Sequence, residues 1–140
     1  MDSNNLAEQL LAREAAKLEE TKRFNAEREI ARALAPQKWD ELKRGFEGEC
    51  AALSRTALRC AFECEQPDAF TFHLNRIVNG VALRAAAFRF EPALPGILFE
   101  SEHRSDIITF MVDGSRLNYV IGRRGLILKE FVMELILNST

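Results

Sequence analysis

The strongest constraint on the fold is the alternation of apolar and polar residues in the strand-like segments that follow residue 57. The first such segment has Leu58, Cys60, Phe62 and Cys64 at every second position, and Phe70, Phe72 and Leu74 continue the pattern. A period of two is typical of strands with one buried face. We interpret Gln66-Pro67-Asp68 and residues 91–96 as turn or loop segments, and Ile97 to about Glu102 as a further strand.

Two dipeptides predict hairpins with a testable register. A turn centred on Asn79-Gly80 places Asn75 opposite Arg84, Leu74 opposite Ala85 and Phe72 opposite Ala87. A turn centred on Asp113-Gly114 places Phe110 opposite Leu117 and Ile108 opposite Tyr119. Both registers separate an apolar face from a polar face, which a one-residue error would not do. The sequence therefore predicts a six-stranded antiparallel meander sheet that helices cover on one face.

One conflict in this pattern leaves two alternatives open. Phe88 and Phe90 fall on the polar face if Ala85 and Ala87 face the core. Either a β-bulge within residues 85–87 resets the alternation, or the outer face carries an apolar patch of Phe88, Phe90, Leu98 and Met111. A patch of that kind on a soluble protein usually marks an interface.

Helix-forming residues dominate both ends of the chain. Residues 6–35 lack Pro and Gly and are rich in Ala, Leu, Glu, Lys and Arg. Pro36 predicts a break or kink there, so we expect an N-terminal helical arm, residues 1–35, and a single α+β domain, residues 36–140. A second helix follows, with Trp39, Leu42, Phe46, Cys50 and Leu53 on one stripe.

The apolar surface of these helices suggests self-association. The last predicted helix, residues 126–137, is apolar over more than half its circumference, so it needs another helix or a partner chain in addition to the sheet. The arm is too polar to be stable alone, which favours a partner. A heptad frame through Leu10, Lys17 and Phe24 contains a charge, so the arm is not a strict coiled coil. We expect either a solvated helix or an arm that packs on a second copy.

Composition argues against several classes of protein. The chain of 140 residues has a net charge of −2, which argues against a nucleic-acid-binding domain. The N-terminus has no signal-peptide pattern, and the C-terminal apolar run is too short and too charged to span a membrane. Three cysteines form no disulfide framework, and we expect Cys50, Cys60 and Cys64 to be reduced core residues of a cytoplasmic protein.

One loop is similar to a known functional motif. Gly122-Arg123-Arg124-Gly125, between an apolar pair and an apolar segment, resembles the GxxG loop of KH domains. The resemblance covers about ten residues and implies contact with a nucleic-acid backbone through Arg123 and Arg124. A KH loop joins two helices, whereas a strand precedes this one. The alternative interpretation is a tight strand-to-helix turn that needs positive φ at glycine.

We find no catalytic, metal-binding or cofactor-binding motif, and no Ser/His/Asp set. We therefore expect a non-enzymatic protein-interaction or adaptor module that forms a homodimer. Its candidate interface residues are Phe88, Phe90, Leu98, Met111, Met133 and Leu137. The alternative is a small-ligand-binding protein with an apolar pocket between sheet and helices, lined by Phe62, Phe72, Leu74, Ala85, Ala87 and Phe110, unless Trp39 or Phe46 fills that space.

Overall fold

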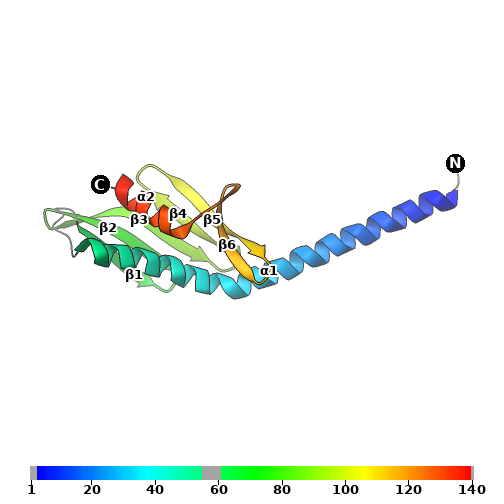
Figure 1. Ribbon diagram of the computed structural model, residues 1–140, viewed down its shortest axis with the longest axis horizontal. Helices are drawn as coiled ribbons and strands as arrows, with labels where there is room; N and C mark the ends of the chain where they lie inside the picture. Colours follow the sequence, from blue (N-terminus) through cyan, green and yellow to red (C-terminus); the bar gives the residue numbers. More distant parts are fainter. Residues whose placement is uncertain (1–2, 55–60, 140) are drawn as a thin grey trace. The chain divides into compact units, whose positions relative to one another are not determined.

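The computed structural model is an α+β protein and describes residues 3–54 and 61–139 (Figure 1). Helix α1 (Ser3–Ser54) comes first and helix α2 (Leu128–Asn138) comes last. Between them lie β1 (Ala61–Asp68), β2 (Thr71–Val78), β3 (Val81–Glu91), β4 (Gly96–Ser101), β5 (Ser105–Asp113), β6 (Arg116–Ile121) and β7 (Arg124–Gly125). The chain divides into two compact units, Met1–Ile30 and Ala31–Thr140.

The strands form one antiparallel sheet in which each strand pairs with its neighbours in sequence, from β1 to β7. The prediction of six strands is wrong by one. Gly122 has φ +61° and turns the chain back, so that Arg124 and Gly125 pair with Ile121 and Val120. The predicted turn at Gln66-Pro67-Asp68 is also wrong, because β1 continues to Asp68 with an irregular register after Glu65.

The hairpin of β2 and β3 has the predicted turn but only part of the predicted register. Asn79 and Gly80 both have positive φ, as a type I′ turn requires. Asn75 pairs with Arg84 as predicted, but the register then shifts, so that Leu74 pairs with Ala86 and Phe72 with Phe88. The predicted pairs of Leu74 with Ala85 and of Phe72 with Ala87 are therefore wrong. The β-bulge alternative is confirmed.

This bulge decides where the two phenylalanines of β3 point. Phe88 and Phe90 are 1% and 4% exposed, so both belong to the core. The outer apolar patch that included them is therefore a wrong prediction. A single extra residue at Ala85 moves every following side chain of β3 to the opposite face.

The hairpin of β5 and β6 differs from its predicted register by two residues. Phe110 pairs with Tyr119 and Ile108 pairs with Ile121, because the turn is centred on Gly114 and Ser115. A shift of two residues keeps each side chain on its predicted face. Ile108, Leu117 and Tyr119 are accordingly buried.

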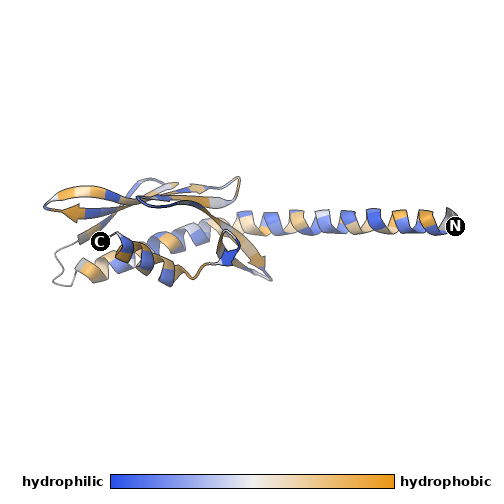
Figure 2. Cartoon of the chain, turned by 90° about the horizontal axis from the view of Figure 1, so that it is seen from above, coloured by the Kyte–Doolittle hydropathy of each residue, from blue (hydrophilic) through white to orange (hydrophobic). Residues whose placement is uncertain are grey.

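In the unit from Ala31 onward, α1 and α2 cover one face of the sheet (Figure 2). The buried stripe of α1 consists of Ala31, Ala35, Trp39, Leu42, Phe46 and Cys50. Trp39 stacks on Phe90 with ring centroids 5.7 Å apart, and Phe46 lies 5.1 Å from Phe88. Phe131 of α2 meets Phe99 edge-on at 5.5 Å. These aromatic contacts join both helices to the central strands.

Of the predicted break or kink at Pro36, the break is wrong. Helix α1 continues through Pro36 without interruption. Ala35 and Trp39 on either side are buried, and tertiary packing of this kind outweighs a local helix-breaking preference.

Helix α2 begins at Leu128, two residues later than predicted, and buries Phe131, Val132, Leu135 and Ile136. It contacts α1 as well as the sheet. A Cβ atom added at Gly45 would lie 3.5 Å from Cγ2 of Val132, which shows how close the two helices approach. This second contact accounts for part of the broad apolar face of α2, while Met133 and Leu137 are exposed.

The unit that ends at Ile30 consists, where described, of the first part of α1. Every side chain described from Asn5 to Ile30 is exposed. Neither helix of the described chain combines the length and apolar character needed to cross a bilayer.

Candidate functional site

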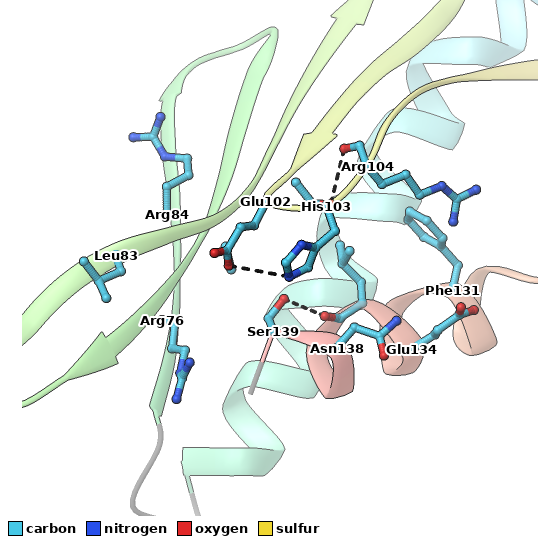
Figure 3. Close-up of a pocket in the computed structure, with 13 residues that line it drawn as sticks. Arg76, Leu83, Arg84, Glu102, His103, Arg104, Phe131, Glu134, Asn138 and Ser139 are labelled. Atoms are coloured by element: carbon cyan, nitrogen blue, oxygen red, sulfur yellow. Dashed lines mark hydrogen bonds and ion pairs between the residues drawn. The ribbon is translucent and has the colours of Figure 1, made fainter.

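A pocket of about 510 Å³ lies between the last turn of α2, strands β2 and β3, and the turn after β4 (Figure 3). Its wall combines basic, acidic and apolar side chains from the β2–β3 hairpin, the turn after β4 and α2. The lining residues are Arg76, Leu83, Arg84, Ala85, Ser101, Glu102, His103, Arg104, Phe131, Glu134, Leu135, Asn138 and Ser139.

The polar groups of the turn are held mainly by one another. Arg104 forms an ion pair with Asp106 at 3.3 Å and lies 5.6 Å from the Phe99 ring centroid. His103 lies 3.9 Å from Glu102, but both side chains are more than three-quarters exposed, so solvent weakens this contact. Ser101 Oγ donates a hydrogen bond to the carbonyl oxygen of Arg104 at 3.3 Å. The pocket offers polar groups beside an apolar wall, an arrangement suited to binding.

The six residues predicted to line an apolar pocket lie in different surroundings. Phe62, Phe72 and Leu74 are buried core residues. Phe46 lies with its ring centroid 6.0 Å from that of Phe72, which agrees with the expectation that Trp39 or Phe46 fills this space. Phe110 is half-buried and its ring lies 5.8 Å from the ring of Tyr119.

The two small residues of that predicted set lie at different surfaces. Ala85 lines the pocket next to α2. Ala87 lines a separate, shallow groove of about 600 Å³ that also contains Leu98 and Ile107. Sequence patterns could not show this, because the β3 bulge directs the two alanines differently.

The predicted interface residues fall into two groups. Phe88 and Phe90 are buried within the chain and are not available to a partner. Leu98, Met111, Met133 and Leu137 are exposed, with Leu137 the most exposed of the four at 68%.

The Gly122–Gly125 loop is a turn between two strands. Arg123 and Arg124 are exposed. The positive φ at Gly122 was expected, but the predicted strand-to-helix connection is wrong, because β7 intervenes and α2 starts at Leu128. The loop therefore lacks the helix that directly follows a KH-type loop, and nucleic-acid contact through the two arginines stays a prediction.

Two cysteines form a close pair. Sγ of Cys64 lies 3.4 Å from Sγ of Cys50, and both thiols are free. Cys60 lies outside the described residues. Within the described part of the chain, three or more His, Cys, Asp or Glu side chains nowhere gather as a metal site would require.

His73 lies on β2 with its side chain half-buried. Its Nδ1 lies 3.8 Å from Oε2 of Glu65, and the same carboxylate oxygen accepts a hydrogen bond from Nδ2 of Asn75 at 3.2 Å. Nδ1 of His73 is buried and makes no hydrogen bond within the described chain, whereas Glu65 on β1 and Asn75 on β2 are joined to each other across the two strands.

Sequence reasoning missed most of the pocket by α2. Of its lining residues, only Ala85 was a candidate pocket residue, and it was predicted for a different pocket. Arg76, Glu134 and Asn138 come from elements that meet only in the folded chain, and none of them belongs to a local motif. Comparison with known proteins adds no further assignment, since no protein-family model, curated protein or solved structure matches the chain.

Proposed function

We propose that this protein is a non-enzymatic interaction module that self-associates through residues 5–30 of α1. One observation carries the proposal: this segment exposes six large apolar side chains and buries none. They are Leu6, Leu10, Leu11, Leu18, Phe24 and Ile30, with exposed fractions between 37% and 66%. Leu11 and Leu18 share one face, and Leu6, Leu10, Phe24 and Ile30 lie roughly 80–120° around the helix from Leu18, so a partner that covers part of this surface removes apolar side chains from water.

The charges of the segment favour a second copy in antiparallel orientation. If two helices cross at Leu18, Glu8 lies level with Arg28 of the other copy, Glu14 with Lys22, and Lys17 with Glu19. Each of these pairs is attractive and occurs twice in a symmetric dimer. The like-charged pair Arg13 and Arg23 is also level.

The helical period separates these pairs by face. Residues advance by about 100° each around a helix, so Leu11, Leu18 and Asn25 lie on one side, with Glu14 and Lys22 beside them. Arg13 and Arg23 fall toward the opposite side, where their repulsion is small. A parallel pair with Leu11 and Leu18 at d positions would instead bring Glu14 of one helix near Glu19 of the other, because g and e positions face each other across such a pair.

The orientation can be tested by charge reversal in the full chain. Glu14→Lys turns two attractive pairs into Lys–Lys pairs, and we expect the dimer to dissociate roughly tenfold more readily. The double variant Glu14→Lys/Lys22→Glu restores opposite charges and should recover the original dissociation constant. Sedimentation equilibrium over micromolar concentrations measures both effects.

Glu20→Lys provides the matched control, because it makes the same change of charge on the side away from Leu18. It should leave the dissociation constant within about twofold of the original value. A wild-type monomer at tens of micromolar would refute self-association. Stronger association of the Glu14→Lys variant would refute the antiparallel arrangement while leaving self-association intact.

The pocket beside α2 supports a second candidate function, the binding of a small molecule that has an apolar body and a charged group. Phe131, Leu135 and Leu83 supply apolar surface, and Arg76, Arg84 and Arg104 supply positive charge. Anilinonaphthalene sulfonate is a suitable probe because it combines both features. Leu83→Glu should abolish its fluorescence enhancement, whereas Leu94→Glu, which changes a similarly exposed leucine outside the pocket, should preserve it. Equal fluorescence in both variants would refute this site.

A further inference from the structure

Cys50 of α1 and Cys64 of β1 hold two free thiols in direct contact at the edge of the core. The Cys64 thiol donates a hydrogen bond to Sγ of Cys50 over 3.4 Å. Cys50 is buried and Cys64 is half-buried. The sulfur atoms of a disulfide are about 2.05 Å apart, so these two sulfurs need to approach by only roughly 1.4 Å.

The hydrogen bond gives the two thiols different roles. It lowers the pKa of Cys50, because the donated proton stabilises a thiolate there, although burial and the nearby Glu49 and Glu47 act in the opposite direction. The same bond raises the pKa of Cys64, and burial together with Cys50, Glu47 and Glu63 adds to that rise. This asymmetry favours Cys50 as the attacking sulfur while Cys64 holds the proton, and the 3.4 Å contact keeps the second sulfur within reach.

We propose that Cys50 and Cys64 are a redox modification site, which a hydroperoxide converts into a reversible disulfide between α1 and β1. The resting state is the reduced pair seen in the structure. This inference is independent of self-association, because both residues lie in the unit from Ala31 onward.

The reaction balances in two steps. The Cys50 thiolate attacks the outer oxygen of the hydroperoxide; the S–O bond forms, the O–O bond breaks, and the alkoxide leaves and takes a proton to become an alcohol. Cys64 sulfur then attacks the Cys50 sulfenic acid; the S–S bond forms, the S–O bond breaks, and hydroxide leaves with the Cys64 proton as water. Two thiols are oxidised by two electrons and one hydroperoxide is reduced. A dithiol reductant reverses the change by thiol–disulfide exchange.

The product would fasten the last turns of α1 to the edge strand of the sheet. Cys64 pairs across the sheet with Leu74, and Cys50 ends the buried stripe of α1. A covalent bond at this place opposes separation of the helix end from β1. The oxidised protein should therefore unfold at a higher temperature than the reduced protein.

The decisive experiment uses the full chain with Cys60→Ser, so that only the two proposed thiols remain. The reduced protein is treated with hydrogen peroxide at a small molar excess, and its thiols are counted over time. Both thiols should disappear together, and a tryptic digest without reductant should contain residues 45–55 joined to residues 60–76. Dithiothreitol should restore both thiols.

Two variants of the Cys60→Ser protein, each lacking one of the two thiols, separate the two roles. In Cys60→Ser/Cys64→Ser, Cys50 should stop at a sulfenic acid that dimedone traps, whereas in Cys60→Ser/Cys50→Ser the thiol of Cys64 should react at least tenfold more slowly. Circular dichroism verifies that each variant is folded. If either variant unfolds, the Cys60→Ser protein alone tests the proposal. Its two thiols should be oxidised faster in the folded protein than in the same protein unfolded in urea.

Four results would overturn the proposal. The two thiols of folded Cys60→Ser protein would remain free under peroxide, or they would form disulfides only between chains, or they would oxidise no faster than in urea. Preferential pairing of Cys60 in the wild-type chain would also contradict it.

Discussion

Tyr119 of β6 donates a hydrogen bond from its hydroxyl to the main-chain carbonyl oxygen of Lys38 in α1, at 2.6 Å. The Lys38 ammonium lies 5.1 Å from the centre of the Tyr119 ring. The tyrosine is 4% exposed, so the contact joins helix and sheet where water is nearly excluded. The hydrogen bond partner is a backbone atom of an uninterrupted helix, which fixes where β6 lies along α1.

Tyr119→Phe tests the energy of this bond. The ring and its packing remain, but the Lys38 carbonyl oxygen loses its tyrosine donor. We expect the free energy of unfolding to fall by about 1–2 kcal/mol. Urea unfolding followed by circular dichroism measures the change. Thr109→Val is a control, because that hydroxyl makes an exposed bond of 3.4 Å and should contribute less than about 0.5 kcal/mol.

Tyr119 also predicts a loss of stability at alkaline pH. Burial, followed by the nearby Glu41, raises the pKa of this phenol above its ordinary value of about 10. Below pH 10 both folded and unfolded chains keep the proton. As the pH rises above about 10, the unfolded chain releases it while the folded chain retains it, so the free energy of unfolding falls by up to about 1.4 kcal/mol per pH unit.

The Tyr119→Phe variant isolates this effect from the titration of lysines. The wild-type protein should lose stability more steeply than the variant above pH 10, and the two should run parallel below it. Tyr119 is the one tyrosine of the chain, so phenolate absorbance reports its ionisation directly. Ionisation of the folded protein at pH 10 would contradict the prediction.

Phe88 should be among the most sensitive core positions. Its ring lies within 6.4 Å of the rings of four other phenylalanines, Phe46, Phe72, Phe99 and Phe131, which belong to both helices and two other strands. Phe88→Ala should lower the free energy of unfolding by about 3–5 kcal/mol. Met111→Ala, at an exposed position of β5, should change it by less than about 0.5 kcal/mol. Equal effects of the two substitutions would show that the bulge does not direct Phe88 inward.

The sequence predicts strand faces better than strand partners. Alternation assigns Ile108, Leu117 and Tyr119 to the buried face, and these assignments survive a register error of two residues. The error arose because the turn is centred on Gly114 and Ser115, and alternation cannot detect an even shift. The bulge at Ala85 was detectable as a conflict in the pattern, but the choice between a bulge and an outer patch required the observed pairing.

Features that depend on tertiary contacts could not be predicted from the sequence. β7 has two residues and no periodicity to recognise. The pocket beside α2 gathers residues from β2, β3 and α2 whose proximity follows from the register and from the position of the last helix. The contact between Cys50 and Cys64 likewise depends on how α1 lies over β1, although both residues were recognised as candidates for the core.

Pro36 provides the last prediction, because it lies inside α1 although it cannot donate a backbone hydrogen bond. Proline in a helix interior costs about 3 kcal/mol relative to alanine, while replacing it makes the unfolded chain more flexible by up to about 1 kcal/mol. Pro36→Ala should therefore raise the free energy of unfolding by about 1–2 kcal/mol, and urea unfolding measures it. Pro92→Ala, in the exposed turn after β3, is the control and should be neutral or slightly destabilising. A loss of stability in Pro36→Ala would mean that the proline is required to shape the helix where Ala35 and Trp39 pack. Pro36 would then stabilise the folded state instead of destabilising it.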